Sequence, residues 1–289
     1  MVRSKGWEQR LVTFFSYFIL IVMTLLCIIP FIRLFAMSFS SEIFVQSGEV
    51  FLWPRGFTTG AISFVFGNNA FQDAFGITVA ATVTFMALSL VTTVLTAYPL
   101  SRPYLAGARF FSLLIVFTML FNGGIIPTYL VVKTLGLLDT FWALVIPHMI
   151  SAFNVIILIS FFRSLPLDYE ESAKMDGASN WKVLAYIIVP LSKPILATIA
   201  LFYAVFRWNY WFDVLMYINS PERYTLQIVL KNLIQNTDGS IMTVFTDHHY
   251  ALLSVQGAAV LFTILPILLV YPFLQKYFVK GVMIGGIKG

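Results

Sequence analysis

Three polar side chains stand in an apolar, aromatic stretch in the last third of the chain. Arg207, Asn209 and Asp213 lie among, or directly after, seven aromatic residues that fall between positions 202 and 212. A charged side chain near the centre of a bilayer costs about 2.5–3.5 kcal/mol, so these groups are expected to face protein or a water-filled cavity. The chemistry open to them is hydrogen bonding to a polar solute, or bracing of neighbouring helices and of a partner subunit.

This stretch divides into two stripes when it is read as one continuous helix. The first stripe holds Phe202, Phe206, Asn209 and Asp213, and the second holds Tyr203, Arg207, Tyr210 and Val214. Arg207 and Asp213 then lie on different faces, so they are not expected to neutralise one another. A polar stripe in the preceding apolar run is placed to face them and consists of His148, Ser151 and Asn154. Trp208 and Trp211 are expected to pack or to anchor the helix at the membrane interface.

Residue patterns for catalysis, nucleotide binding or metal binding are sparse elsewhere. No GxxxxGK[ST] segment is present, so nucleotide binding is not expected within this chain. Apart from His148 the histidines are the adjacent His248 and His249, which point in different directions and are expected to be solvated rather than to bind metal. The single cysteine, Cys27, has no disulfide partner and is expected to be a small core residue. We therefore expect no bound cofactor or metal and no chemistry on a substrate.

The composition as a whole excludes a soluble enzyme. The chain has 289 residues, of which 59% are hydrophobic and 11% charged, against about 25% charged in ordinary soluble domains. The net charge of +5 comes from cations dispersed between apolar runs, which fits membrane loops better than nucleic-acid binding. Most of the surface is therefore expected to face lipid.

Six apolar stretches are long enough to cross a bilayer as helices, which predicts an all-α integral membrane protein of one domain, 1–289. The predicted spans are 11–35, 77–100, 110–132, 141–162, 194–218 and 252–278. The first is expected to be a retained span, because its apolar run is longer than a signal-peptide core. Lys and Arg number 12 in the segments on the side of the amino terminus and 4 on the other side, so both termini are predicted to be cytoplasmic. The outer segments 38–76 and 219–251 either contact partners or merely join spans.

The predicted cytoplasmic loop 163–193 has the signals of two short helices joined by a sharp turn. Asp168 stands three residues before Glu171 and is expected to cap a helix that ends at Gly177, where glycine adopts the left-handed conformation. A second helix is expected from about Ser179 until Pro190 stops it. Its predicted apolar face consists of Trp181, Leu184, Ala185 and Ile188.

At these spacings the loop resembles that of the permease subunits of bacterial ATP-binding-cassette importers, which reads EAA, three residues, G, nine residues, I, x, L, P. The matching positions here are Glu171, Ser172, Ala173, Gly177, Ile187, Val189 and Pro190. Ser172 replaces an alanine and Val189 a leucine, and both changes are small in volume. The segments AYPLSRP, EESAKMDGAS and WNYWFDVL resemble the carbohydrate-importing branch that includes the maltose-type permeases. The ending YPFLQKYFVKGVMIGGIKG is similar to the subgroup that imports complex or uronate-containing oligosaccharides.

The resemblance implies a transmembrane domain of the type I, maltose-permease-like kind in the prokaryotic cytoplasmic (inner) membrane. It also implies an ATPase-coupling surface made of Glu171, Ser172, Ala173, Asp176, Gly177, Ile187 and Pro190. The path of a sugar is predicted from the residues themselves, because aromatic faces stack on sugar rings while polar groups bond hydroxyls. The predicted path residues are Tyr203, Phe206, Arg207, Asn209, Tyr210 and Asp213.

The implied partners are a second homologous permease, two cytoplasmic ATPase subunits that carry ATP and Mg, an extracytoplasmic solute-binding protein, and membrane lipid, but no nucleic acid. A heterodimer is expected, and a homodimer stays open. Glu171 either pairs with a basic residue of the ATPase or only caps its own helix. The glycine-rich tail 280–289 is not expected to form a stable isolated helix, and either lies against the ATPase or is frayed. The alternative function is an ion-coupled secondary sugar transporter, although six helices without an evident inverted repeat would not build its two-halved site.

Overall fold

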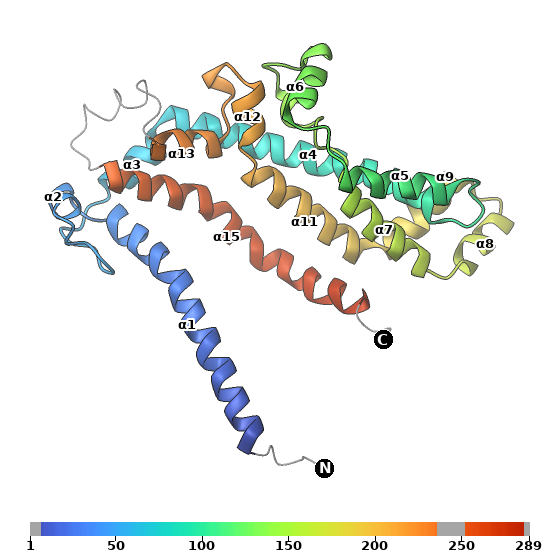
Figure 1. The fold of residues 1–289 in the computed structure, drawn as a ribbon, viewed down its shortest axis with the longest axis horizontal. Helices are drawn as coiled ribbons and strands as arrows, with labels where there is room; N and C mark the ends of the chain where they lie inside the picture. Colours follow the sequence, from blue (N-terminus) through green and yellow to red (C-terminus); the bar gives the residue numbers. More distant parts are fainter. Residues whose placement is uncertain (1–6, 236–251, 286–289) are drawn as a thin grey trace. The chain divides into compact units, whose positions relative to one another are not determined.

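The computed structural model describes residues 7–235 and 252–285, which are almost entirely helical (Figure 1). The elements are α1 (Trp7–Ser38), α2 (Glu42–Gln46), α3 (Gly60–Gly67), α4 (Asn69–Ser101), α5 (Ala108–Leu120), α6 (Ile125–Thr134), η1 (Phe141–Leu144), α7 (Ala152–Ser164), α8 (Asp168–Met175), α9 (Asn180–Val183), η2 (Leu184–Ile188), α10 (Val189–Leu191), α11 (Lys193–Asn209), α12 (Phe212–Tyr217), η3 (Pro221–Arg223), α13 (Leu226–Gln235) and α15 (Leu252–Gly285). Within the described ranges β structure is limited to one isolated antiparallel bridge, Ser40 to Phe57. The chain forms two compact units, Met1–Phe71 with Leu230–Leu265, and Gln72–Val229 with Pro266–Gly289.

Three of the predicted spans are single long helices in the structure. They are α1, α4 and α15, and each is long and apolar enough to cross a membrane. α15 continues to Gly285, so the first part of the predicted irregular tail is helical, and residues 286–289 lie outside the described residues. At 1.5 Å per residue the 33 residues of α4 reach about 50 Å, which exceeds the hydrocarbon core. α4 is therefore longer than a straight crossing of the apolar layer requires.

The other three predicted spans are not continuous helices. Span 110–132 breaks between α5 and α6 with a bend of 115°, at a pair of glycines of which Gly124 has a φ of 88°. Span 141–162 becomes a regular helix only at Ala152, because Pro147 disfavours helical geometry in the residue before it. Span 194–218 breaks between α11 and α12, and the chain also bends by 83° between α10 and α11. By length and composition, the described residues supply up to six spans if each bent helix pair counts as one.

The segment 38–76 is more structured than a plain loop. It contains α2, α3 and the first turns of α4, and the Ser40–Phe57 bridge closes it on itself. The Arg55 guanidinium pairs with the Glu49 carboxylate at 2.6 Å on its surface. The segment 219–251 likewise contains η3 and α13, while 236–251 lies outside the described residues.

No side chain in the most apolar 18-residue stretch of α1 is buried. Cys27 is therefore exposed on α1, which corrects the expectation that it is a core residue. A helix that is apolar on all sides must be covered by lipid or by another chain.

The core of the second unit holds the functional segments in place. Buried side chains of α4, α7, η2 and α11 pack together there, and they include Phe85, Tyr98, Phe162, Ile188 and Tyr203. This cluster fixes the start of α7 against α11, and it fixes the loop between α7 and α11 against the end of α4.

Candidate functional site

A buried ion pair stands at the break between α11 and α12. The Arg207 guanidinium donates to Asp213 Oδ2 at 3.0 Å, and both side chains are 1% exposed. It also donates to the backbone carbonyls of Leu144 at 3.0 Å and Tyr210 at 3.2 Å. The prediction that Arg207 and Asp213 would not neutralise one another is wrong, because the helix ends at Asn209 and the continuous-helix spacing no longer applies.

This ion pair joins three segments of the second unit. Asp213 Oδ1 lies 3.2 Å from His148 Nε2, in the irregular segment before α7. Removing one partner of such a buried pair costs about 3–5 kcal/mol, because the other charge is left uncompensated. The geometry therefore gives Arg207 and Asp213 the bracing position that the sequence left as an alternative to contact with a solute.

Beside this ion pair lies a pocket of about 450 Å³. Its walls come from the start of α7 and from α11, and its lining residues are His148, Ile150, Ser151, Phe153, Asn154, Phe202, Tyr203 and Phe206. The predicted polar residues of the fourth span thus face the fifth, although His148 and Ser151 precede the helix rather than lie on it. Ser151 caps α7 by accepting a hydrogen bond from the Asn154 N–H at 3.4 Å.

Three rings form an aromatic cluster at this pocket. The rings of Phe206 and Tyr210 stack with centroids 4.8 Å apart, and the His148 ring meets them edge-on at 5.9 and 5.2 Å. Aromatic faces of this kind suit the apolar faces of a ring-shaped polar solute.

Two other predicted path residues are placed differently. The Tyr203 hydroxyl is buried and bonded, 2.6 Å from Thr93 Oγ1 and accepting from the Ser151 N–H at 3.3 Å. The Asn209 side chain turns back to donate to the Val205 carbonyl at 2.8 Å, is exposed and does not line the pocket. Trp208 is buried and packs edge-on against Phe75 with centroids 6.3 Å apart, as expected for a packing residue.

The loop between α7 and α11 has the predicted helix, turn and helix. Gly177 has a φ of 81°, which ends α8, and the Ser179 hydroxyl caps α9 by accepting from the Lys182 N–H at 3.4 Å. Asp168 does not cap α8, because the helix begins one residue earlier than predicted, with Leu167 at the cap position. Pro190 does not stop the second helix, which widens into the π-helical turn η2 and ends only at Ser192.

The exposed face of this loop combines acids with large apolar side chains. Of the predicted coupling residues, Glu171, Ser172, Asp176, Gly177 and Pro190 are exposed, while Ala173 and Ile187 are half-buried. Trp181 is 69% exposed, which corrects its predicted place on the buried face, and Met175 and Tyr186 are exposed by 83% and 79%. Val183 takes the buried position instead. Exposed apolar side chains of this size are typical of a surface that contacts another protein or the membrane.

Sequence reasoning missed the contact that anchors the loop. Glu170 is buried and forms an ion pair with Arg102, which follows α4 and is equally buried. Arg102 also donates to the Phe162 carbonyl at 2.9 Å, and the Tyr98 hydroxyl donates to Glu170 Oε2 at 3.4 Å. All three side chains stand in the segments AYPLSRP and EESAKMDGAS, but helical spacing within one segment carries no signal of a contact between segments.

Metal binding finds no support in the described residues, where no group of three or more His, Cys, Asp or Glu is placed to hold an ion. His248 and His249 lie outside the described residues.

Comparisons with known proteins agree on one class. Residues 100–284 match the family described as binding-protein-dependent transport system inner membrane component. The chain is 44% identical over 270 residues to protein LplC of Bacillus subtilis (strain 168), covering 91% of this chain and 90% of the relative. It is 39% identical over 285 residues to the polygalacturonan/rhamnogalacturonan transport system permease protein YtcP of the same organism, covering 98% and 100%.

Solved structures give the same result. A chain of a bacterial ABC transporter involved in the import of the acidic polysaccharide alginate superposes with a TM-score of 0.89 at 35% identity, covering 96% of this chain and 99% of that one. A chain of a bacterial alginate ABC transporter in complex with an alginate pentasaccharide-bound periplasmic protein superposes with a TM-score of 0.58 at 15% identity, which supports the fold alone.

Proposed function

Because the chain belongs to the family of binding-protein-dependent transport system inner membrane components, we propose that it forms half of the channel through which an ATP-driven importer moves an oligosaccharide into the cytoplasm. The chain is a sugar ABC importer permease subunit of the inner membrane, and its relatives are transport subunits rather than enzymes.

The observation that carries the proposed path is the aromatic pocket between α7 and α11. Phe206 and Asn154 line the pocket, and Tyr210, which is not itself a lining residue, stacks on the Phe206 ring at its edge. In this proposal Tyr203 shapes the wall through its bonds to Thr93 and Ser151, and the Arg207–Asp213 ion pair holds the wall in place. Asn209 has no part in the pocket.

The proposed topology has six spans with both termini in the cytoplasm. Its support is the excess of Lys and Arg on the amino-terminal side, together with three long apolar helices in the described residues. The α7–α11 loop is then cytoplasmic, and its exposed Met175, Trp181 and Tyr186 dock on one of two ATPase subunits that bind ATP and Mg.

Two further partners complete the proposed importer. A second, similar permease pairs with this chain across the path, as a heterodimer. An extracytoplasmic solute-binding protein delivers the sugar, and the support for this partner is the family's description as components of binding-protein-dependent transport systems. The proposed cargo is a uronate-containing oligosaccharide, supported by the polygalacturonan/rhamnogalacturonan named for YtcP and the acidic polysaccharide alginate named for the 35% identical transporter.

Accessibility of single cysteines tests the path. Cysteines are placed at Phe206 and Tyr210, with Asn209 as the matched control, in a Cys27→Ala transporter with its partner subunits. A water-soluble thiol reagent should label all three positions in at least one nucleotide state. Delivered oligosaccharide should protect positions 206 and 210 but not 209. Protection at none of the three positions, or equal protection at all of them, would show that the sugar does not pass through this pocket.

Energy dependence separates this function from an ion-coupled secondary transporter. Uptake into vesicles should survive an ionophore and stop when ATP is depleted. The opposite pattern would exclude the importer. Binding assays of the solute-binding protein with uronate-containing and neutral oligosaccharides of equal length test the cargo, and a preference for the neutral sugar would overturn that part of the proposal.

A further inference from the structure

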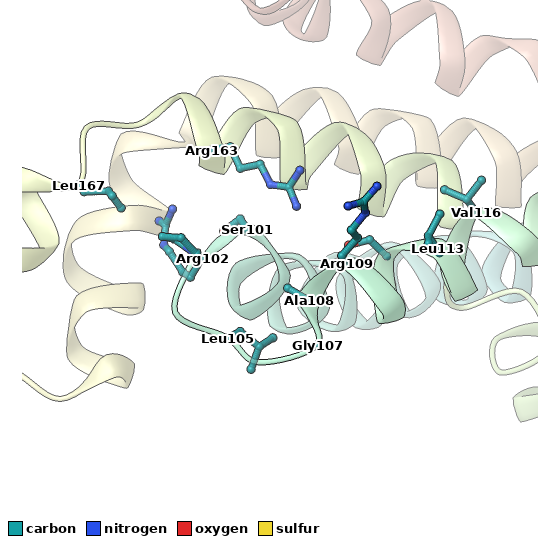
Figure 2. Close-up of a pocket in the computed structure, with 12 residues that line it drawn as sticks. Ser101, Arg102, Leu105, Gly107, Ala108, Arg109, Leu113, Val116, Arg163 and Leu167 are labelled. Carbon is teal, nitrogen blue, oxygen red and sulfur yellow. The ribbon is translucent and has the colours of Figure 1, made fainter.

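A second pocket, of about 820 Å³, lies where α4, α5 and α7 meet (Figure 2). Three arginines line it: Arg102 after the end of α4, Arg109 in the first turn of α5 and Arg163 at the end of α7. No acidic residue is among its lining residues. Its volume falls within the range of pockets that hold small ligands.

The charges of these arginines are unequally compensated. Arg102 is neutralised by Glu170, as described above. Arg163 donates only to a neutral acceptor, the Leu100 carbonyl, at 3.2 Å. In the part of the chain that the structure describes, the Arg109 side chain has no hydrogen bond or ion pair. Two positive charges therefore share one pocket, and in Figure 2 both guanidinium groups extend into it.

Buried polar atoms at the same pocket also lack partners among the described residues. They are Arg102 Nε, on a side chain that is 1% exposed, and the Ser112 hydroxyl. Buried donors usually bond to protein, water or a ligand. Two uncompensated guanidinium groups and additional donors together favour an anion with several acceptor oxygens, and a phosphate group meets this description.

The apolar side of the pocket indicates what carries the phosphate. Leu113 and Val116 stand four and seven residues after Arg109, so the three share one face of α5. Leu113 and Val116 are 59% and 39% exposed, and α5 buries no residue in the chain. Along this face, cationic side chains at the end of the helix give way to apolar side chains one and two turns further on. A lipid has the same order of headgroup and acyl chain, whereas a free phosphate has no use for the apolar part.

We propose that this pocket binds the phosphate headgroup of an anionic phospholipid, with the acyl chains lying along α5. The site is additional to the oligosaccharide path, and it takes only its leaflet, the cytoplasmic one, from the proposed topology. A basic pocket between membrane helices is a known type of lipid headgroup site. Arg102 lines this pocket and also pairs with Glu170, so the bound lipid lies beside the ion pair that anchors the α7–α11 loop.

The test measures lipid retention by the transporter purified with its partner subunits. The complex is placed in phosphatidylcholine nanodiscs containing phosphatidylglycerol, and retained phosphatidylglycerol is counted by native mass spectrometry. Arg109→Ala is the first variant, because Arg109 is exposed and unbonded, so its loss should not disturb folding. It should lower phosphatidylglycerol retention about fivefold, as expected for one charge near an anionic surface, and Arg109→Ala with Arg163→Ala about thirtyfold. Arg10→Ala, an exposed arginine on α1 on the same predicted membrane side, is the matched control and should change retention less than twofold.

Three results would overturn the proposal. One is unchanged retention in the double variant, with the complex still assembled. Another is an equal loss in Arg10→Ala, which would indicate nonspecific attraction. The third is displacement of the lipid by millimolar inorganic phosphate, combined with lipid retention that stays the same when Leu113 and Val116 are substituted. This result would indicate a free-phosphate site. Retention is read without transport, so failure of the lipid site and failure of the importer function are separate results.

Discussion

The buried pair of Arg102 and Glu170 makes a sharp prediction, because an exposed glutamate stands next to it. Glu170→Gln removes the charge and keeps the shape, which leaves Arg102 charged and buried. Loss of one partner of a buried pair costs about 3–5 kcal/mol. Both side chains are at most 3% exposed, so solvent does not screen the loss. The glutamine oxygen still accepts a hydrogen bond, and Arg102 keeps its bond to the Phe162 carbonyl. We therefore expect Glu170→Gln to lower the free energy of unfolding by about 3 kcal/mol, the lower end of this range.

The assay compares Glu170→Gln with Glu171→Gln in the assembled transporter. Thermal unfolding followed by tryptophan fluorescence should show a fall in Tm of about 6–12 °C for Glu170→Gln. Glu171 is exposed, so its change should cost less than about 0.5 kcal/mol. Sugar-stimulated ATP hydrolysis should also fall in Glu170→Gln, because the α7–α11 loop loses its attachment to the end of α4.

A double variant completes this experiment. Replacing Arg102 and Glu170 together by methionine removes both charges and should restore most of the Tm, since apolar residues of similar volume replace buried ion pairs at little cost. Equal losses in the two glutamine variants, or no recovery in the double variant, would refute the assignment of the ion pair as the anchor of the loop.

Three further predictions concern other parts of the second unit. Gly177→Val should uncouple ATP hydrolysis from uptake while Gly177→Asn largely preserves coupling, because open space surrounds the glycine and only its φ of 81° opposes a side chain, at about 1 kcal/mol or more for a β-branched one; unchanged transport stoichiometry in the valine variant would contradict this. Asp213→Asn should destabilise the transporter by roughly 3 kcal/mol and Asp213→Leu with Arg207→Met should recover much of it, measured by thermal unfolding, whereas two additive losses would argue against the pair. The pKa of Asp139 is held below its usual value of 3.8, mainly by the Ser220 hydroxyl and N–H, so its contribution to stability is present above pH 3.8 and is lost as the pH falls through the lowered pKa. The protection of the amides around Ser220 against hydrogen exchange, relative to their intrinsic exchange rate at each pH, should therefore fall at acid pH in the natural chain, and Asp139→Asn should remove that dependence; the same acid response in both would show that another group is responsible.

Local signals were sufficient wherever one segment determines its own structure. Long apolar runs predicted α1, α4 and α15, and Gly177 predicted the turn of the α7–α11 loop because only local backbone conformation is involved. The all-helical class and the family likewise followed from patterns that can be read along the chain.

Contacts between distant segments were beyond those signals. The break after Asn209 depends on Arg207 bonding Leu144, Tyr210 and Asp213, and helical periodicity treats the stretch as unbroken. The exposure of Trp181 was missed for a related reason. An apolar side chain on an amphipathic helix is assigned to the core unless the surface of a partner is known.

The anchor of the α7–α11 loop also bears on how this sequence can drift over generations. Arg102 and Glu170 are 68 positions apart, yet changing either one alone strands a buried charge. A substitution at one of these positions is therefore tolerated only when the other position changes with it. The neighbouring Glu171 is exposed, so its packing places no such constraint on it. Homologues that lack the arginine should therefore lack the glutamate too, and the two positions should covary.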